Sequence, residues 1–151
     1  MTKELLEAIV KSPVEVLNRA YRIEARVDAK NEQIRHWREL ATSITLNPDN
    51  NGSGSNYPKS KIEACAIRIA ELQDDIADDI AALIQTNVEI RLAIDQLCST
   101  TLYKTVLELR YVNHLRWEEI AVRLNYTYRW TQELHTRAVA DIRRQAAKAL
   151  L

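Results

Sequence analysis

Two polar side chains, Arg129 and Gln132, stand about one helical turn apart in the segment WEEIAVRLNYTYRWTQELHT (117–136) and could read the edges of DNA bases. A guanidinium matches the two acceptors that guanine presents in the major groove, and a glutamine amide matches the donor and acceptor of adenine. Each such pair is worth about 1–3 kcal/mol of discrimination between bases. The segment therefore indicates hydrogen bonding to DNA rather than catalysis.

The elements that must position these side chains are two short helices joined by a tight turn at Asn125. Asparagine tolerates the left-handed backbone that such a turn requires, and Thr127 is a favourable N-cap for the helix that follows. Ala121 is small enough to let the two helices cross closely. The apolar residues expected to seat them are Ile120, Leu124, Tyr126 and Leu134. This spacing is typical of a helix-turn-helix, whose second helix lies in the major groove.

The first turns of that second helix would present their outward side chains to the DNA, whereas Thr131 and Leu134 would face the first helix. The outward side chains are Thr127, Tyr128, Arg129, Gln132, Glu133 and Thr136. Basic side chains that follow are candidates for phosphate contacts, which set affinity and salt dependence. They are Arg137, Arg143, Arg144 and Lys148. The alternative is a plain helical hairpin whose polar residues face water.

The flanking sequence and the charge distribution favour the DNA interpretation. TLYKTVLELRYVNHL (101–115) offers an apolar face that could complete a three-helix unit. Residues 99–151 hold nine Lys and Arg against five Asp and Glu, a net charge of +4, whereas residues 61–98 hold three against eight, a net charge of −5. The neutral total therefore conceals a basic C-terminal end. The apolar face of 101–115 comprises Leu102, Val106, Leu109 and Val112.

The stretch ELRYVNHLRWEEIAVRLNYTYRWTQELHTRA (108–138) resembles region 4 of the sigma-70 family, the part of a bacterial sigma factor that binds the −35 promoter element. The resemblance is closer to a family of small phage and prophage proteins of Gram-positive bacteria, long described as a domain of unknown function. That family joins a sigma-like helix-turn-helix to an N-terminal helical region. WRELATSIT (37–45) and SKIE (60–63) are similar to the same family, so the resemblance covers most of residues 37–144. Two positions depart from its pattern: His114 stands where glycine is common, and Thr131 where valine is usual.

This resemblance implies a transcriptional regulator of phage or prophage genes that binds double-stranded promoter DNA, with host RNA polymerase as a further partner. A full sigma factor is not expected, because residues 61–98 are acidic and lack the aromatic residues of a helix that melts promoter DNA. A small terminase, the recognition subunit of DNA packaging, also combines a helix-turn-helix with oligomerising helices and is the alternative function. A coiled-coil interaction protein without DNA binding is a third hypothesis.

Two long helices are predicted before the DNA-reading unit. A capping box with proline at the first helical position, Ser12-Pro13-Val14-Glu15, predicts a helix from near residue 13. A second capping box, Ser60-Lys61-Ile62-Glu63, predicts a helix that runs to about Leu97. Between them NPDNNGSGSNYPK (47–59) favours a flexible loop. Because the helices match in length at about 34 and 37 residues, each near 50–55 Å long, they predict an antiparallel hairpin.

Apolar residues recur along both helices at the three- and four-residue spacing of a coiled coil. In the first helix the seam comprises Val16, Ala20, Ile23, Val27, Ile34, Trp37, Ala41 and Ile44. In the second it comprises Ile62, Cys65, Ile69, Leu72, Ile76, Ile80, Leu83, Asn87, Ile90, Ile94 and Leu97. Two successive four-residue steps at 72–76–80 break the heptad, so we expect local unwinding there. Asn87 either fixes the register as a buried amide or points to the edge of the seam.

The predicted all-α fold thus has a coiled-coil oligomerisation region, residues 1–98, and a helix-turn-helix DNA-binding domain, residues 99–151. Two exposed helices rarely bury enough surface alone, so we expect a homo-oligomer, with a dimer favoured. A dimer would also place two reading heads on one duplex. The residues expected to hold the oligomer together are Ile23, Val27, Ile34, Trp37, Ile69, Ile76, Leu83, Asn87 and Ile90.

Enzymatic and membrane functions have little support in the sequence. The three histidines lie far apart without partners at ligand or triad spacing, and no Gly-rich phosphate loop is present. No segment reaches the roughly 18 apolar residues of a membrane span. We therefore expect a cytoplasmic protein that is not an enzyme and uses no cofactor.

The acidic run DDIADD (74–79) could hold a divalent cation, because hard cations prefer oxygen ligands. In an antiparallel hairpin, however, the run lies roughly opposite Arg26, Lys30 and Arg35. A solvated network of ion pairs, each adding little stability, is the favoured interpretation. We expect no metal site.

Overall fold

The computed structural model describes residues 1–46 and 57–151, and every regular element within those ranges is a helix. The predicted all-α class is confirmed for these residues. The chain divides into two compact units, one formed by Met1–Tyr21 with Ile84–Leu151 and the other by Arg22–Leu83. The predicted flexible loop 47–59 lies outside the described residues, except that its last three residues belong to a helix. The division of function at residue 98 stays a prediction.

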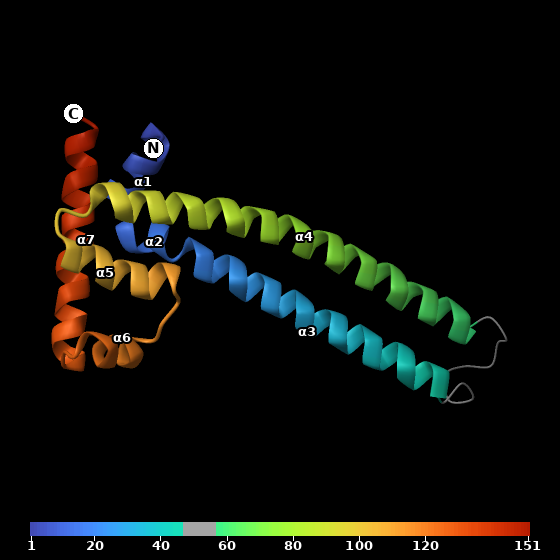
Figure 1. Cartoon of the computed structure of the whole chain (residues 1–151). Helices are drawn as coiled ribbons and strands as arrows, with labels where there is room; N and C mark the ends of the chain where they lie inside the picture. Colours follow the sequence, from blue (N-terminus) through green and yellow to red (C-terminus); the bar gives the residue numbers. More distant parts are fainter. Residues whose placement is uncertain (47–56) are drawn as a thin grey trace. The chain divides into compact units, whose positions relative to one another are not determined.

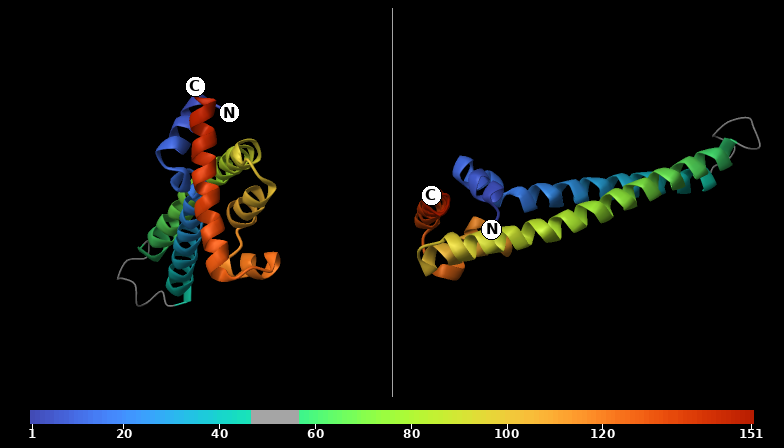
Figure 2. Two further views of the ribbon diagram at one scale, coloured as in Figure 1. Left: turned by 90° about the vertical axis from the view of Figure 1, so that its left-hand side faces the viewer. Right: turned by 90° about the horizontal axis from the view of Figure 1, so that it is seen from above.

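The second unit contains most of α3 (Arg19–Leu46) and of α4 (Tyr57–Leu97), which run side by side in opposite directions (Figures 1 and 2). Nζ of Lys30 lies 2.6 Å from the Asp79 carboxylate, and the Arg26 guanidinium lies 3.5 Å from it. The hydrogen bond from Lys30, aided by the charges of both cations, holds the pKa of Asp79 below its ordinary value. The predicted pairing is thus confirmed for Asp79, the last residue of the acidic run, with two of the three predicted basic residues.

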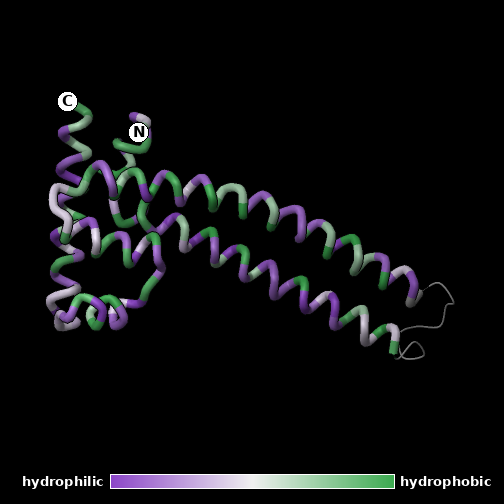
Figure 3. Tube along the Cα trace, in the orientation of Figure 1, coloured by the Kyte–Doolittle hydropathy of each residue, from purple (hydrophilic) through white to green (hydrophobic). Residues whose placement is uncertain are grey.

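The seam residues of both helices are largely withdrawn from solvent, and Figure 3 shows apolar and polar residues alternating along each helix. Of those predicted to oligomerise, three are buried and six half-buried. The buried ones are Ile23, Ile34 and Ile90; the half-buried ones are Val27, Trp37, Ile69, Ile76, Leu83 and Asn87. Ile80 was wrongly predicted in the seam, because its side chain is 45 % exposed. A step of four residues is longer than one turn of 3.6 residues, so each step moves the side chain around the helix axis. Two such steps in succession move Ile80 away from the buried face of α4.

One of the two predicted helix starts is confirmed and the other differs. A helix begins at Pro13, as predicted. The helix expected from residue 13 is divided into α2 (Pro13–Leu17) and α3 by Asn18, whose φ and ψ are −83° and −2°. Asn competes for backbone hydrogen bonds and is a poor interior helix residue. Ser12 makes no side-chain capping bond. The second helix begins at Tyr57, so Ser60 lies within it and does not cap it.

The first unit is organised around α7 (Tyr128–Ala149), against which α1 (Lys3–Lys11), α2, α5 (Thr101–Leu107) and α6 (Trp117–Leu124) pack (Figure 1). Helix α1 was not predicted from the sequence. Thr2 caps it by accepting a hydrogen bond from the backbone N–H of Leu5 (3.2 Å), and its apolar face is buried. Burial against α7 stabilises a helix of nine residues, which is too short to persist alone in water.

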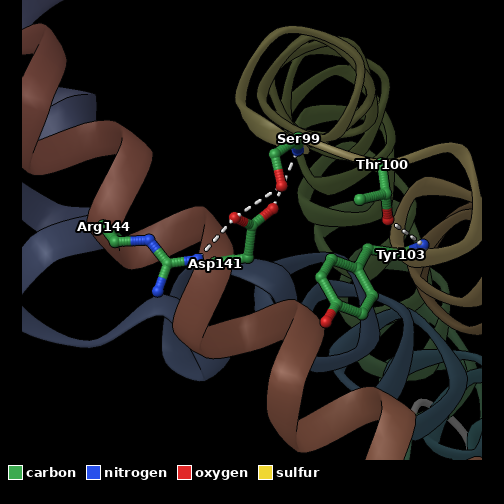
Figure 4. Close-up of polar contacts among 5 residues, drawn as sticks. All are labelled: Ser99, Thr100, Tyr103, Asp141 and Arg144. Carbon is green, nitrogen blue, oxygen red and sulfur yellow. Dashed lines mark hydrogen bonds and ion pairs between the residues drawn. The ribbon is translucent and has the colours of Figure 1, made fainter.

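A buried carboxylate in α7 holds the start of α5 in place (Figure 4). Asp141 is fully buried and accepts two hydrogen bonds from Ser99, one from the backbone N–H and one from the hydroxyl, each 2.8 Å long. The Arg144 guanidinium donates a third at 2.9 Å. Next to Ser99, Thr100 caps α5 by accepting from the N–H of Tyr103. This network positions α5 against α7, which carries the candidate DNA-reading face.

Among the described helices, none combines the length and the apolar character needed to cross a membrane. Cys65 and Cys98 are free thiols. Burial is the main reason that the pKa of Cys98 is raised to about 12, so this thiol stays protonated at neutral pH and is a poor nucleophile.

Candidate nucleic-acid interface

Helices α6 and α7 are joined by a turn centred on Asn125, which adopts the left-handed conformation with φ 58° and ψ 42°. The N–H of Tyr126 donates to the carbonyl of Ala121 (2.9 Å), and the N–H of Asn125 donates to the carbonyl of Val122 (3.1 Å). This pair of bonds is a Schellman motif, which satisfies the last carbonyls of α6. The turn lies where the sequence predicts it, and asparagine supplies its positive φ at low cost.

The start of α7 is capped as the sequence predicts. The hydroxyl oxygen of Thr127 accepts a hydrogen bond from the N–H of Trp130 at 3.1 Å. Thr131 is fully buried, and its hydroxyl donates to the carbonyl of Thr127 at 2.9 Å. Threonine can therefore replace an apolar residue at this position, because its polar group has a partner within the same turn.

The packing of α6 on α7 follows the predicted apolar pattern with one exception. Ile120 and Leu134 are 0 % and 2 % exposed. Ala121 is 6 % exposed, in keeping with its role as the small residue where α6 and α7 cross. Leu124 is half-buried. Tyr126 was wrongly assigned to the core, because 39 % of its surface is exposed. The Schellman turn reverses the chain at Asn125 and leaves the next side chain at the surface.

The side chains predicted to face outward form a continuous polar surface over the first three turns of α7. Tyr128 is 50 % exposed, Gln132 is half-buried, and the others are exposed. We call this surface the reading face; it comprises Thr127, Tyr128, Arg129, Gln132, Glu133, Thr136 and Arg137. The buried residues Thr131 and Leu134 lie on the opposite side of the same turns.

Arg137 is held in place from two directions. Its Nη2 lies 2.8 Å from Oε1 of Glu133, one turn earlier on α7. Its guanidinium carbon lies 5.1 Å from the centroid of the Trp130 ring, within the range of a cation–π interaction. The side chain is 52 % exposed, so the guanidinium can still meet a phosphate. The neighbouring carboxylate of Glu133 would compete for it.

The remaining phosphate candidates lie further along α7 and have partners within the chain. Nη2 of Arg143 donates to the backbone carbonyl of Lys11 at 3.3 Å, and Arg144 pairs with the buried Asp141. Lys148 lies in the last turn of α7. The structure thus brings the residues of the reading face together on one side of α7, whereas Arg143 and Arg144 contact other residues of the first unit.

Behind the reading face, His135 packs in a cluster of rings that joins α7 to α6. Its Nε2 lies 2.6 Å from the hydroxyl of Tyr111, and its ring centroid lies 4.6 Å from that of Trp117. Burial, followed by the charge of Arg110, lowers the pKa of His135 to about 4. The imidazole is therefore neutral near pH 7. His135 therefore contributes to the packing between η2 (Glu108–Val112), α6 and α7.

The segment before α6 contains a feature that periodicity did not reveal, the π-helical turn η2 (Glu108–Val112). The wider turn changes which side chains face inward. Tyr111 is buried and Val112 is half-buried, whereas the prediction placed Val112 on the apolar face. Leu102, also expected on that face, lies in the first turn of α5, before η2, and is 36 % exposed. Val106 and Leu109 are buried as predicted. π-Helical turns often mark functional sites.

Arg110 in η2 and His114, which follows it, make contacts that fix the segment between η2 and α6. The Arg110 guanidinium donates to the carbonyl of Leu115 at 3.0 Å and lies 4.8 Å from the centroid of the Trp117 ring. His114 has φ 58°, a left-handed conformation that glycine adopts without steric cost. Its ring centroid lies 4.5 Å from that of Tyr21, which compensates for the strain of a non-glycine residue.

The first turns of α7 offer hydrogen-bond donors, one acidic acceptor, Glu133, and one exposed aromatic ring, Tyr128. In residues 1–46 and 57–151, no group of three or more His, Cys, Asp or Glu side chains is placed to hold a metal ion. Comparison of the chain with family models, with curated proteins and with solved structures finds no match. The function is therefore argued from the reading face and from the sequence pattern that carries it.

Proposed function

We propose that this protein is a sequence-specific DNA-binding regulator of phage or prophage transcription, in which residues 117–137 act as a sigma region 4-like helix-turn-helix. The observation that carries the proposal is the reading face, a polar surface on the first turns of α7 whose opposite side is buried against α6. The Schellman turn at Asn125 and the cap at Thr127 support it, because they hold α7 at a defined angle to α6.

In the proposed complex the N-terminal half of α7 enters the major groove. Arg129 pairs with guanine and Gln132 with adenine, whereas Glu133 can accept from the amino group of cytosine. Arg137 contacts a phosphate and sets the register of the helix on the duplex. Tyr128, half exposed, contributes contacts with sugar or a thymine methyl group. The antiparallel helices α3 and α4 lie within the first 98 residues, to which the sequence-based prediction assigns self-association.

Host RNA polymerase is the second proposed partner, because the sequence resembles region 4 of a sigma factor, and sigma factors bind RNA polymerase. The outer side of α6 offers a surface for it: Val122 is 82 % exposed and is flanked by Glu118 and Glu119. A Glu118→Ala variant that binds DNA normally but no longer activates transcription would support this contact. Absence of polymerase from a pull-down with the wild-type chain would exclude it.

The test of DNA binding is a genome-wide pull-down of bound DNA from a host that carries the encoding element. Wild-type protein is compared with Arg129→Ala, which removes the strongest predicted base contact from an exposed position and should leave the fold intact. We expect sharp enrichment at one or a few promoters and its loss in the variant. Enrichment at a packaging site would instead identify a small terminase. Equal enrichment by both proteins, or none, would refute reading of DNA by Arg129.

A further inference from the structure

The outward side of α4 in the first unit carries an apolar stripe that the proposed function does not use. Ile84, Val88 and Leu92 are spaced four residues apart and are 62 %, 48 % and 42 % exposed. Residues four apart lie on one face of a helix. Ile90 and Ile94, on the other side of the same turns, are 1 % and 0 % exposed. In this part of α4 the residues of the predicted seam are therefore already covered by other parts of the same chain, whereas the stripe remains exposed.

The stripe forms one wall of a groove of about 650 Å³ between α4 and η2. Val88 and Leu92 line it from α4, and Glu108 and Val112 line it from η2. At one end Asp95 is held by Lys104, whose Nζ lies 2.6 Å from the carboxylate. The groove therefore has an apolar part, formed by Val88, Leu92 and Val112, and polar residues beside it. The charge of Asp95 is neutralised by Lys104 of the same chain.

Two charged side chains of opposite sign remain along the groove, Arg91 on α4 and Glu108 on η2. In the part of the chain that the structure describes, neither side chain forms an ion pair. Within the chain Arg91 acts electrostatically on Asp95, and Glu108 on Lys104, but neither is within ion-pair distance of its partner. A surface that carries such a cation and such an anion beside an apolar stripe can complement a second copy of itself. A two-fold axis would set Arg91 of each copy against Glu108 of the other, as an isologous interface requires.

We propose that this face, consisting of Ile84, Val88, Arg91, Leu92, Glu108 and Val112, binds a second copy of the chain. The inference deepens the proposed function and rests on it for the need to place two reading faces on one duplex. It moves the dimer contact from the predicted seam to the outer side of α4. Burial of the stripe drives the association, and the two reciprocal ion pairs fix the orientation of the copies.

The experiment is analytical ultracentrifugation of the full chain without DNA over a wide range of concentration. We expect a reversible dimer for the wild type. Arg91→Glu and Glu108→Arg should each weaken dimerisation about tenfold or more, because like charges would then face each other across the axis. The double variant Arg91→Glu/Glu108→Arg should restore it, because the reciprocal pairs form again with exchanged signs.

A matched pair of apolar substitutions locates the interface independently. Ile84 and Ile67 lie on the same helix and are both 62 % exposed. Ile84→Lys should weaken dimerisation, whereas Ile67→Lys should leave it unchanged, with circular dichroism showing equal helix content in both. A monomeric wild type, or loss of the dimer in Ile67→Lys alone, would overturn the proposal. Because no DNA is present, failure of this proposal is distinguishable from failure of DNA binding, which the pull-down reports.

Discussion

Asp141 and Ser99, 42 residues apart in the chain, are joined by two hydrogen bonds of 2.8 Å, through which both oxygens of a fully buried carboxylate are satisfied. Desolvation by burial raises the pKa of this carboxyl, but the hydrogen bonds from Ser99 and Arg144 outweigh it, and the pKa lies below its ordinary value. Asp141 is therefore ionised in the folded chain at neutral pH. A buried charge with a complete set of partners holds α5 to α7 more strictly than apolar packing alone.

Replacing Asp141 with alanine should lower the free energy of unfolding by about 2–4 kcal/mol, because the two hydrogen bonds that join Ser99 to α7 would be lost together with the contact to Arg144. Urea denaturation followed by circular dichroism measures this loss. Arg144→Ala is the matched control, because the Arg144 side chain is 61 % exposed and its removal should cost no more than about 1 kcal/mol. Similar losses in the two variants would show that the carboxylate is not the centre of the network.

The features that could be predicted from the sequence are those that depend on the local backbone. Asn125 and Thr127 have a conformational preference that acts within one turn, so the turn and the cap lie where expected. The inward position of Thr131 and Leu134 follows from helical periodicity once that cap is known. For the same reason the membership of the reading face could be predicted before the packing of the helices was known.

The features that could not be predicted depend on partners far away in the chain. Helix α1 carries local helix signals, an N-cap at Thr2 and an apolar face of Leu5, Leu6 and Ile9, but a helix of nine residues is stable only against a partner, and that partner, α7, lies far away in the chain. Asp141 looked like an ordinary polar residue of a helix, because nothing near it in sequence indicates Ser99 as a partner. The π-helical turn η2 shifts the buried positions by a local backbone change that a fixed period of 3.6 residues cannot represent.

The free energy of unfolding should fall as the pH is lowered below the pKa that His135 has in the unfolded chain. In that range His135 is protonated in the unfolded chain but neutral in the folded one. Its folded pKa is about 4, against about 6.5 in an unfolded chain. Between these values the unfolded chain binds more protons, so stability is complete above about pH 6.5 and is lost as the pH approaches 4. We expect a loss of about 2 kcal/mol from this residue after allowance for its partial exposure.

His135→Gln isolates this contribution, because glutamine does not titrate and its side-chain oxygen can accept a hydrogen bond from Tyr111. Urea denaturation at several pH values between 4 and 7 should show a shallower pH dependence for the variant than for the wild type. If the two slopes are equal, protonation of His135 is not coupled to unfolding. The difference between the proteins is the quantity of interest, because carboxylates such as Asp141 titrate equally in both.

Asn125 should tolerate glycine but not a β-branched residue. At φ 58° a side chain without a local hydrogen bond collides with the backbone, at a cost of about 1–2 kcal/mol, and glycine avoids this cost. Thermal unfolding should therefore rank Asn125→Gly close to the wild type and Asn125→Val clearly below both. Equal melting temperatures for the glycine and valine variants would contradict the assignment of strain to this turn. DNA affinity should fall with the same ranking, because the turn sets the angle of α7.

Arg129 and Arg137 should contribute to DNA binding in different ways. Arg129→Ala should remove about 1–3 kcal/mol of preference for the target over a scrambled duplex. Arg137→Ala should weaken binding to both duplexes alike and reduce the slope of log affinity against log salt concentration by about 1. Fluorescence anisotropy with labelled duplexes at several salt concentrations measures both quantities. The reverse pattern would exchange the roles of the two residues.

Glu133 should restrain the affinity of the reading face, since its carboxylate lies 2.8 Å from the Arg137 guanidinium and would approach the DNA phosphates. Glu133→Gln removes this competing charge, whereas Trp130 still holds Arg137 through the cation–π contact. We expect the variant to bind scrambled DNA a few-fold more tightly, which corresponds to a gain of about 0.5–1 kcal/mol in binding free energy. It should also lose discrimination between bases at the position that Glu133 faces. Combining it with Arg137→Ala should abolish the gain if it comes through Arg137. A gain that persists in the double variant would instead come from reduced repulsion between Glu133 and the DNA itself.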